Sequence, residues 1–346
     1  MLLILLPALL QAIPAPPAAA AASDSGERHL RNIRQLTFGG QNAEAYFSRS
    51  GRQIIFQRQE SDSGCDQEFV MNVDGSGMHR VSSGRGRTTC GYFFANDDRV
   101  FYSTTEHAGA ACPPRPDYSK GYVWALYDYD IYAANADGSG GGARRITKNP
   151  HYDAEGTLSP DGKTIVFTSL RDGDLDIYTI GVDGRHLKRL TRTLGYDGGP
   201  FFSPDGKQIV YRAWHPQTAA DSSDYRALIA QNLVRPVRME IWVMDADGSQ
   251  QRQVTDLGGA NFSPYFHPDG RRIIFASNYK NPRSRNFDLY LVDQDGTGLQ
   301  QITTNTEFDA FPMFSPDGHQ LVWASNRNGK VPGETNIFLA DWIENP

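Results

Sequence analysis

The chain has 346 residues, a length that suits one large domain or two ordinary ones. Its 34 Lys and Arg against 40 Asp and Glu give a formal net charge of −6, without a basic block, which argues against a nucleic-acid partner. Aromatic residues make up 11% of the chain, with 34 Gly and 20 Pro, and this favours a globular body of short strands and tight turns.

An apolar run over residues 2–13 precedes small residues that continue to Ala22. This pattern is typical of a secretory signal peptide and is too short to span a membrane, although no Lys or Arg precedes Arg28. The alternative is a disordered apolar tail. We expect a signal peptide over residues 1–22, a linker over 23–32, and a mature protein that is periplasmic or secreted.

A turn phrase recurs six times in the rest of the chain. Four clear copies contain Pro-Asp-Gly and two divergent copies precede them: Leu158–Lys163, Phe202–Lys207, Phe266–Arg271, Phe314–His319, Phe47–Arg52 and Phe94–Arg99. Pro fixes one backbone dihedral of such a turn and Gly leaves another free, so each copy predicts a tight turn between two strands.

The best copy, residues 152–191, predicts four strands, at 154–159, 164–169, 176–182 and 187–191. Four antiparallel strands per copy, repeated at a spacing of about 45 to 65 residues, indicate propeller blades. The sixth copy ends after its third strand, at 336–342, and the missing fourth-strand pattern appears at 33–37. We therefore predict an all-β protein, a six-bladed β-propeller over 33–346, closed by an N-terminal strand that completes the last blade.

Two insertions, at 105–129 and 212–239, separate the second and third strands of their blades. The second has apolar residues at helical spacing from Asp224 to Val234, which predicts one short helix capped by Ser222 or Ser223. Because first strands line the channel and second strands return, both insertions are expected on the face where the first strands begin.

All three cysteines, Cys65, Cys90 and Cys112, are expected on that same face. Our hypothesis is that Cys112 forms a disulfide with Cys65 or Cys90 and so pins the first insertion. The alternative is a set of buried, unpaired cysteines.

The repeats resemble the TolB-type propeller repeats of bacterial periplasmic proteins, over about residues 33–342. The Ser-Pro-Asp-Gly-Lys turn, the Ile-Tyr or Ile-Trp third strand, the Asp-Gly-Ser turn and the Arg-Ile-Thr strand carry the resemblance. It implies a six-bladed propeller outside the cytoplasm. TolB carries an α/β domain before its propeller, whereas these repeats begin directly after the expected signal, so no role in the Tol machinery is implied. Similar repeats form the propellers of prolyl-oligopeptidase-type peptidases and oligogalacturonate lyases.

Alignment of the copies on their first turns places six residues at one position, where the first strand enters the channel: Asn42, Thr89, Asp153, Asp197, Asn261 and Asp309. One hypothesis is a ring at the channel mouth that binds a divalent cation or a cationic ligand group. The alternative is that these short side chains satisfy backbone amides at strand entry.

A second set of candidate residues combines arginines that follow second strands with aromatic residues of the same rim: Arg171, Arg212, Arg327, Tyr152, Tyr196 and Trp124. Such residues suit a protein or peptide interface, or else packing between blades and loops.

Catalytic motifs such as Gly-x-Ser-x-Gly, a phosphate loop or His-Glu-x-x-His are absent. The first functional hypothesis is an exported, monomeric, non-catalytic propeller that binds a protein, peptide or glycan at the cell envelope. The second is a metal-dependent, lyase-like carbohydrate-active enzyme that uses His107, His151 and His215 on the insertion face. A third is an accessory propeller of a peptidase system.

Overall fold

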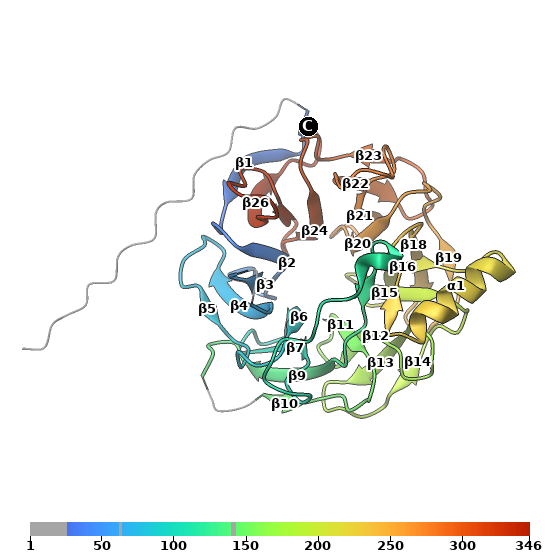
Figure 1. The fold of residues 1–346 in the computed structure, drawn as a ribbon. Coiled ribbons are helices and arrows are strands. Elements are labelled where there is room, and N and C mark those ends of the chain that lie inside the picture. Colours follow the sequence, from blue (N-terminus) through green and yellow to red (C-terminus); the bar gives the residue numbers. More distant parts are fainter. Residues whose placement is uncertain (1–25, 62–63, 140–142) are drawn as a thin grey trace, which may run out of the picture.

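The computed structural model describes residues 26–61, 64–139 and 143–346, so the expected signal peptide lies outside the described residues. Six four-stranded antiparallel sheets surround a central axis (Figure 1). The predicted six-bladed, all-β propeller is therefore confirmed.

The first blade contains β2 (Gln41–Phe47), β3 (Gln53–Gln59), β4 (Gln67–Asn72) and β5 (His79–Arg80), and the second contains β6 (Thr88–Phe93), β7 (Arg99–Thr104), β9 (Asp130–Asn135) and β10 (Arg144–Arg145). The third contains β11 (Asp153–Leu158), β12 (Thr164–Ser169), β13 (Asp176–Gly181) and β14 (Lys188–Arg189). The fourth contains β15 (Tyr196–Phe202), β16 (Gln208–Trp214), β18 (Glu240–Asp245) and β19 (Arg252–Gln253). The last two blades contain β20 (Asn261–Phe266), β21 (Arg272–Ser277), β22 (Asp288–Asp293), β23 (Gln300–Gln301); and β24 (Asp309–Phe314), β25 (Gln320–Ser325), β26 (Asn336–Trp342), β1 (Leu30–Gln35).

The recurring Ser-Pro-Asp-Gly phrase forms the turn between the first and second strands. In the third blade the Ser159 hydroxyl donates to Asp161 (2.6 Å), and Asp161 accepts from the backbone N–H of Lys163 (3.1 Å). Gly162 adopts a φ of +75°, which a glycine reaches without steric cost. The second strand that follows, β12, is buried over five of its six residues, so the blades pack through these strands.

The N-terminal strand closes the ring as predicted. β1 pairs antiparallel with β26, with Leu30 opposite Trp342 and Gln35 opposite Phe338. The strand begins at Leu30 rather than at residue 33, so the end of the expected linker belongs to the propeller. Closure thus joins segments about 300 residues apart and removes two open sheet edges.

A buried ion network reinforces the closure. Arg327 makes two contacts with the Glu27 carboxylate, at 3.0 and 3.1 Å, and a third with Asp309 at 3.1 Å. All three residues are buried. A buried arginine that faces two carboxylates is stable only while these partners remain in place.

The two insertions form a roof over one end of the channel. The first contains the 3₁₀ helix η1 (Tyr118–Lys120) and β8 (Trp124–Ala125). The second contains α1 (Ala219–Ile229) and β17 (Leu233–Val234), and β17 pairs antiparallel with β8. Sequence patterns did not predict this pairing, because two-residue strands carry no periodicity.

The helix of the second insertion begins earlier than predicted. Thr218, not Ser222 or Ser223, is the N-cap, since its hydroxyl accepts from the backbone N–H of Asp221 (3.0 Å). The insertion also starts after Trp214, so Arg212 lies within β16 rather than in a loop.

A disulfide joins Cys65 and Cys112 and ties the first insertion to the first blade. Cys90 is a free, buried thiol. No helix among the described residues is both long and apolar enough to cross a bilayer.

Candidate functional site

A cluster of aromatic rings fills the middle of the channel. The ring centroids of Tyr46 and Phe201 lie 5.5 Å apart, those of Phe201 and Tyr265 5.3 Å, and those of Tyr46 and Tyr92 5.9 Å. One cavity lies on the side of this cluster where the Pro-Asp-Gly turns form the wall. A second cavity lies on the other side, below the insertions. The two channel mouths are therefore separate sites.

A β-bulge in each first strand supplies the residues that face the axis. At the bulge one residue per blade adopts a positive φ between 49° and 61°: Glu44, Cys90, Glu155, Gly199, Ser263 and Phe311. All six line a small axial cavity above the aromatic cluster. The axial ring is thus formed by bulge residues, five of them non-glycine in a conformation that costs free energy.

The predicted cation ring lies elsewhere. Asn42, Asp153, Asp197, Asn261 and Asp309 occupy equivalent strand-entry positions, but in the second blade the equivalent is Thr88, not Thr89, because Phe93, not Phe94, ends the first strand where Phe47 ends it in the first blade. Their side chains are completely or almost completely buried, and each lies two positions before the bulge residue of its blade.

These strand-entry side chains already have partners. Asp153 accepts from Arg171 (2.7 Å) and Ser169 (2.5 Å), and Asn261 donates to the carbonyl of Met239 (2.8 Å). The buried side chains of Asp153 and Asn261 thus bond within the propeller wall rather than facing an open ring at the channel mouth, as the alternative of strand-entry contacts describes.

The three arginines predicted at the rim have different surroundings. Arg171 and Arg327 are paired with buried carboxylates inside their own blades, whereas Arg212 faces a cavity. The three predicted aromatic residues, Tyr152, Tyr196 and Trp124, line that same cavity. The structure brings these four residues together.

We call this space the insertion cavity. It has a volume of about 410 Å³, and its wall combines rings from the first insertion with rings from the blades: Tyr118, Tyr122, Trp124, Tyr127, Tyr129, Tyr152, Tyr196, Phe262, Phe287, Phe308 and Phe311. Phe308 directly precedes β24, the position that Tyr152 holds before β11, whereas Phe262, Phe287 and Phe311 lie in the last two blades at positions that the sequence did not single out.

Two arginines lie against the aromatic wall. The Arg212 guanidinium lies 5.4 Å from the ring centroids of both Trp124 and Tyr196, and that of Arg87 lies 5.7 Å from the Tyr127 ring. Arg212 is buried and pairs with Glu155, which holds its pKa above the usual range despite the opposing effect of burial. The pair is thus a fixed, nearly neutral polar element in an aromatic cavity.

Glu44 is the second carboxyl at the floor of the insertion cavity. Burial raises its pKa from 4.5 to about 7, and the Glu155 carboxylate adds to this shift, while Cys90 and Arg212 oppose it. A carboxyl that titrates near neutral pH inside a cavity is a candidate functional group.

The three histidines of the metal hypothesis do not meet. His107 lies beside Asp128 (3.3 Å), His215 is bonded to Asp197 (3.0 Å) in another blade, and His151 is exposed. The structure therefore does not bring these three side chains together as one set of ligands.

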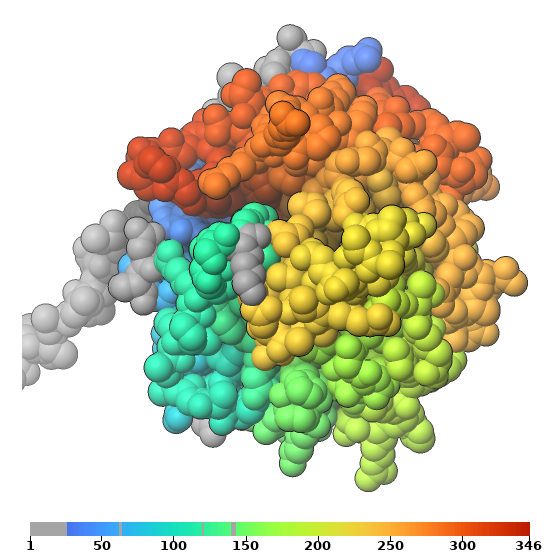
Figure 2. All heavy atoms as spheres, turned by 45° about the vertical axis from the view of Figure 1, so that its right-hand side comes forward, coloured from blue at the N-terminus to red at the C-terminus, as the bar shows by residue number. Residues whose placement is uncertain are grey.

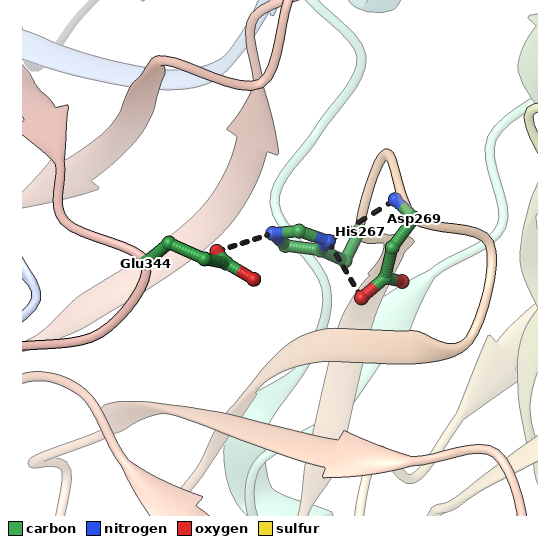
Figure 3. Close-up of side chains that lie close together, drawn as sticks. All are labelled: His267, Asp269 and Glu344. Atoms are coloured by element: carbon green, nitrogen blue, oxygen red, sulfur yellow. Dashed lines mark hydrogen bonds and ion pairs between the residues drawn. The ribbon is translucent and has the colours of Figure 1, made fainter.

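Among the described residues, one group of three has ligand atoms close enough for a metal: His267, Asp269 and Glu344 (Figure 3). The imidazole lies between the two carboxylates, at 3.1 and 3.3 Å. The Arg272 guanidinium contacts both carboxylates and lies against the same ring, so it already supplies the positive charge. The group therefore holds the C-terminal segment against the fifth blade.

A closed ring of blades with one roofed channel mouth defines a class of repeat proteins that carry a ligand site on one face of a rigid scaffold. The model of the TolB beta propeller domain (PD40) matches residues 115–216 and 216–333. The chain belongs to this TolB β-propeller family.

Individual relatives are similar over short stretches or at low identity. The Tol-Pal system protein TolB of Bordetella pertussis is 48% identical over 54 residues, which are 16% of this chain and only 12% of that protein. The structure of TolB from Acinetobacter baumannii is 18% identical, with a TM-score of 0.53, over 87% of this chain and 63% of that one. An oligogalacturonate lyase in complex with manganese is 16% identical, with a TM-score of 0.56, over 95% and 97%. These two structures show the fold alone.

Proposed function

We propose that this protein is an exported binding propeller that holds a peptide segment of a protein partner in the insertion cavity. The observation that carries the proposal is the composition of the cavity wall, which combines eleven aromatic rings with Arg87 and Arg212. Tyr, Trp and Arg dominate binding energies at protein interfaces. The cavity volume of about 410 Å³ also falls within the range of ligand sites, roughly 300–1,000 Å³.

Two further observations support the proposal. The Cys65–Cys112 disulfide suits an oxidising compartment, which favours the periplasm or the cell surface. The similar TolB of Bordetella pertussis is named as part of a Tol-Pal system, a name that refers to more than one protein. A protein partner is therefore the simplest occupant, and one propeller monomer supplies the whole cavity.

The test is selection of a phage-displayed library of random peptides on the purified, disulfide-bonded protein. We expect selected peptides to bind the wild type and to lose about 2 kcal/mol of binding free energy on Trp124→Ala. Trp242→Ala is the matched control, since Trp242 is half-buried in β18 and does not line the cavity. Equal effects of the two substitutions, or no enrichment of any peptide, would refute the proposal.

The alternative of a metal-dependent carbohydrate-active enzyme lacks a supporting geometry. The similar lyase structure is a complex with manganese, but His107, His151 and His215 lie apart in this chain. We therefore propose a binding role alone.

A further inference from the structure

The insertion cavity opens into a larger groove on the same face. This groove has a volume of about 990 Å³ and shares Tyr118, Tyr122, Phe287 and Phe308 with the insertion cavity, so the two spaces are continuous. Figure 2 shows a hollow between the orange segment of the fifth blade and the teal and yellow insertions. We call it the arginine groove, after the arginines in its wall: Arg238, Arg283 and Arg285.

The charge of the arginine groove is opposite to that of the chain. Arg283 and Arg285 are exposed and have no hydrogen bond or ion pair with any described residue, and Arg238 makes an exposed contact with Asp221 (3.2 Å). No Asp or Glu is among the described residues that line the groove. On a chain with a net charge of −6, two unpaired guanidinium groups in one groove favour an anionic ligand.

The rim of the groove exposes apolar surface. Tyr118, Tyr122 and Val237 are 53%, 64% and 37% exposed, and all three line the groove. Large side chains that gather around a concavity in this way indicate a surface that a partner covers. Two tyrosines beside two arginines also match the composition of binding hot spots.

The aromatic wall where the arginine groove meets the insertion cavity favours a peptide over a glycan. Four phenylalanines form a contiguous wall there, with ring centroids 4.9 Å apart for Phe262 and Phe287 and 5.7 Å apart for Phe287 and Phe308 and for Phe262 and Phe311. Sugar hydroxyls against this wall would lose water without gaining hydrogen bonds. An apolar side chain would instead bury its surface favourably.

We propose that the arginine groove binds an acidic peptide segment whose carboxylates meet Arg283 and Arg285 while one apolar side chain enters the insertion cavity. This inference rests on the proposed function and adds the chemistry of the ligand. The guanidinium groups make the groove prefer a negatively charged ligand, and the four phenylalanines bind its apolar side chain.

The test uses three fluorescein-labelled peptides built on Phe with Glu, Gln or Lys flanks, titrated by fluorescence anisotropy on the full chain. We expect the Glu peptide to bind at least about tenfold more tightly than the Gln peptide, and its affinity to fall with added salt. Arg283→Glu with Arg285→Glu should abolish this preference. The matched control is Lys163→Glu with Arg271→Glu, which makes the same charge change at exposed turns on the opposite face. Melting temperatures of both variants verify folding.

The outcomes separate the two proposals. Equal binding of the Glu and Gln peptides, lost on Phe308→Ala, would overturn the acidic preference and leave peptide binding intact. Binding of no peptide here, together with no enrichment in the display selection, would overturn both. An anionic polysaccharide that binds more tightly than the Glu peptide and competes with it would assign the groove to a glycan and overturn the inference.

Discussion

Glu44→Gln should remove a pH-dependent loss of stability. Burial in the channel raises the pKa of Glu44 from 4.5 to about 7. A carboxyl with a higher pKa in the folded state binds its proton more tightly when folded, so its contribution to stability is greatest below pH 4.5 and falls as the pH rises through 7. The difference of about 2.5 pKa units corresponds to a loss of about 3 kcal/mol above neutral pH.

Urea unfolding of the wild type and Glu44→Gln at several values between about pH 5 and pH 8 measures this loss. Burial also raises the pKa of Asp176 to about 7, so the informative quantity is the difference between the two proteins. We expect the variant to gain about 2.5 kcal/mol of unfolding free energy on the wild type across this range. Glu307→Gln, at an exposed carboxyl, is the matched control. Parallel profiles for wild type and Glu44→Gln would show that Glu44 ionises freely and would refute the reasoning.

Two other substitutions test the closure and the roof. Arg327→Met leaves the carboxylates of Glu27 and Asp309 buried without their cation, and should cost roughly 3 to 5 kcal/mol in urea unfolding; a loss below about 1 kcal/mol would show that the network does not hold the ring closed. Cys112→Ser removes a disulfide between residues 47 positions apart, and the loop entropy predicts a loss of about 4 kcal/mol in the free energy of unfolding. A wild type with the same melting temperature with and without reductant would contradict this.

The fold could be predicted because its signals are local and repeated. Each Pro-Asp-Gly turn needs a fixed φ, a capping carboxylate and a residue at positive φ, and the phrase supplies all three next to an apolar strand. The closing strand was predictable for a related reason, since the fourth-strand pattern missing from the last blade appears at residues 33–37. Pairing between β8 and β17 had no such signal.

The site could be predicted only in part, because the bulges change which residues face the axis. Glu44 and Glu155 face the axis through a left-handed conformation that is uncommon for Glu, and no sequence pattern announces it. Alignment of the copies on their first turns instead pointed to Asp153 and its equivalents, two positions earlier in the first strand. Aromatic residues of the rim, Tyr152 and Tyr196, were found because they directly precede or begin first strands.

In the proposed binding site the insertions form the roof, and residues of the last two blades, among them Arg283, Arg285 and Phe308, form another part of the wall. Three independent restraints fix the roof: the disulfide of Cys112, the pairing of β8 with β17, and the hydrogen bond from Tyr225 of α1 to Asp174 (2.7 Å). A roof held in this way loses little conformational entropy when a ligand orders it, so more of the contact energy appears as affinity. Loss of one restraint should disturb first the cluster in which Leu126 and Tyr225 of the roof pack against Leu175 and Tyr196 of the blades, whereas the largest core contains no residue of either insertion.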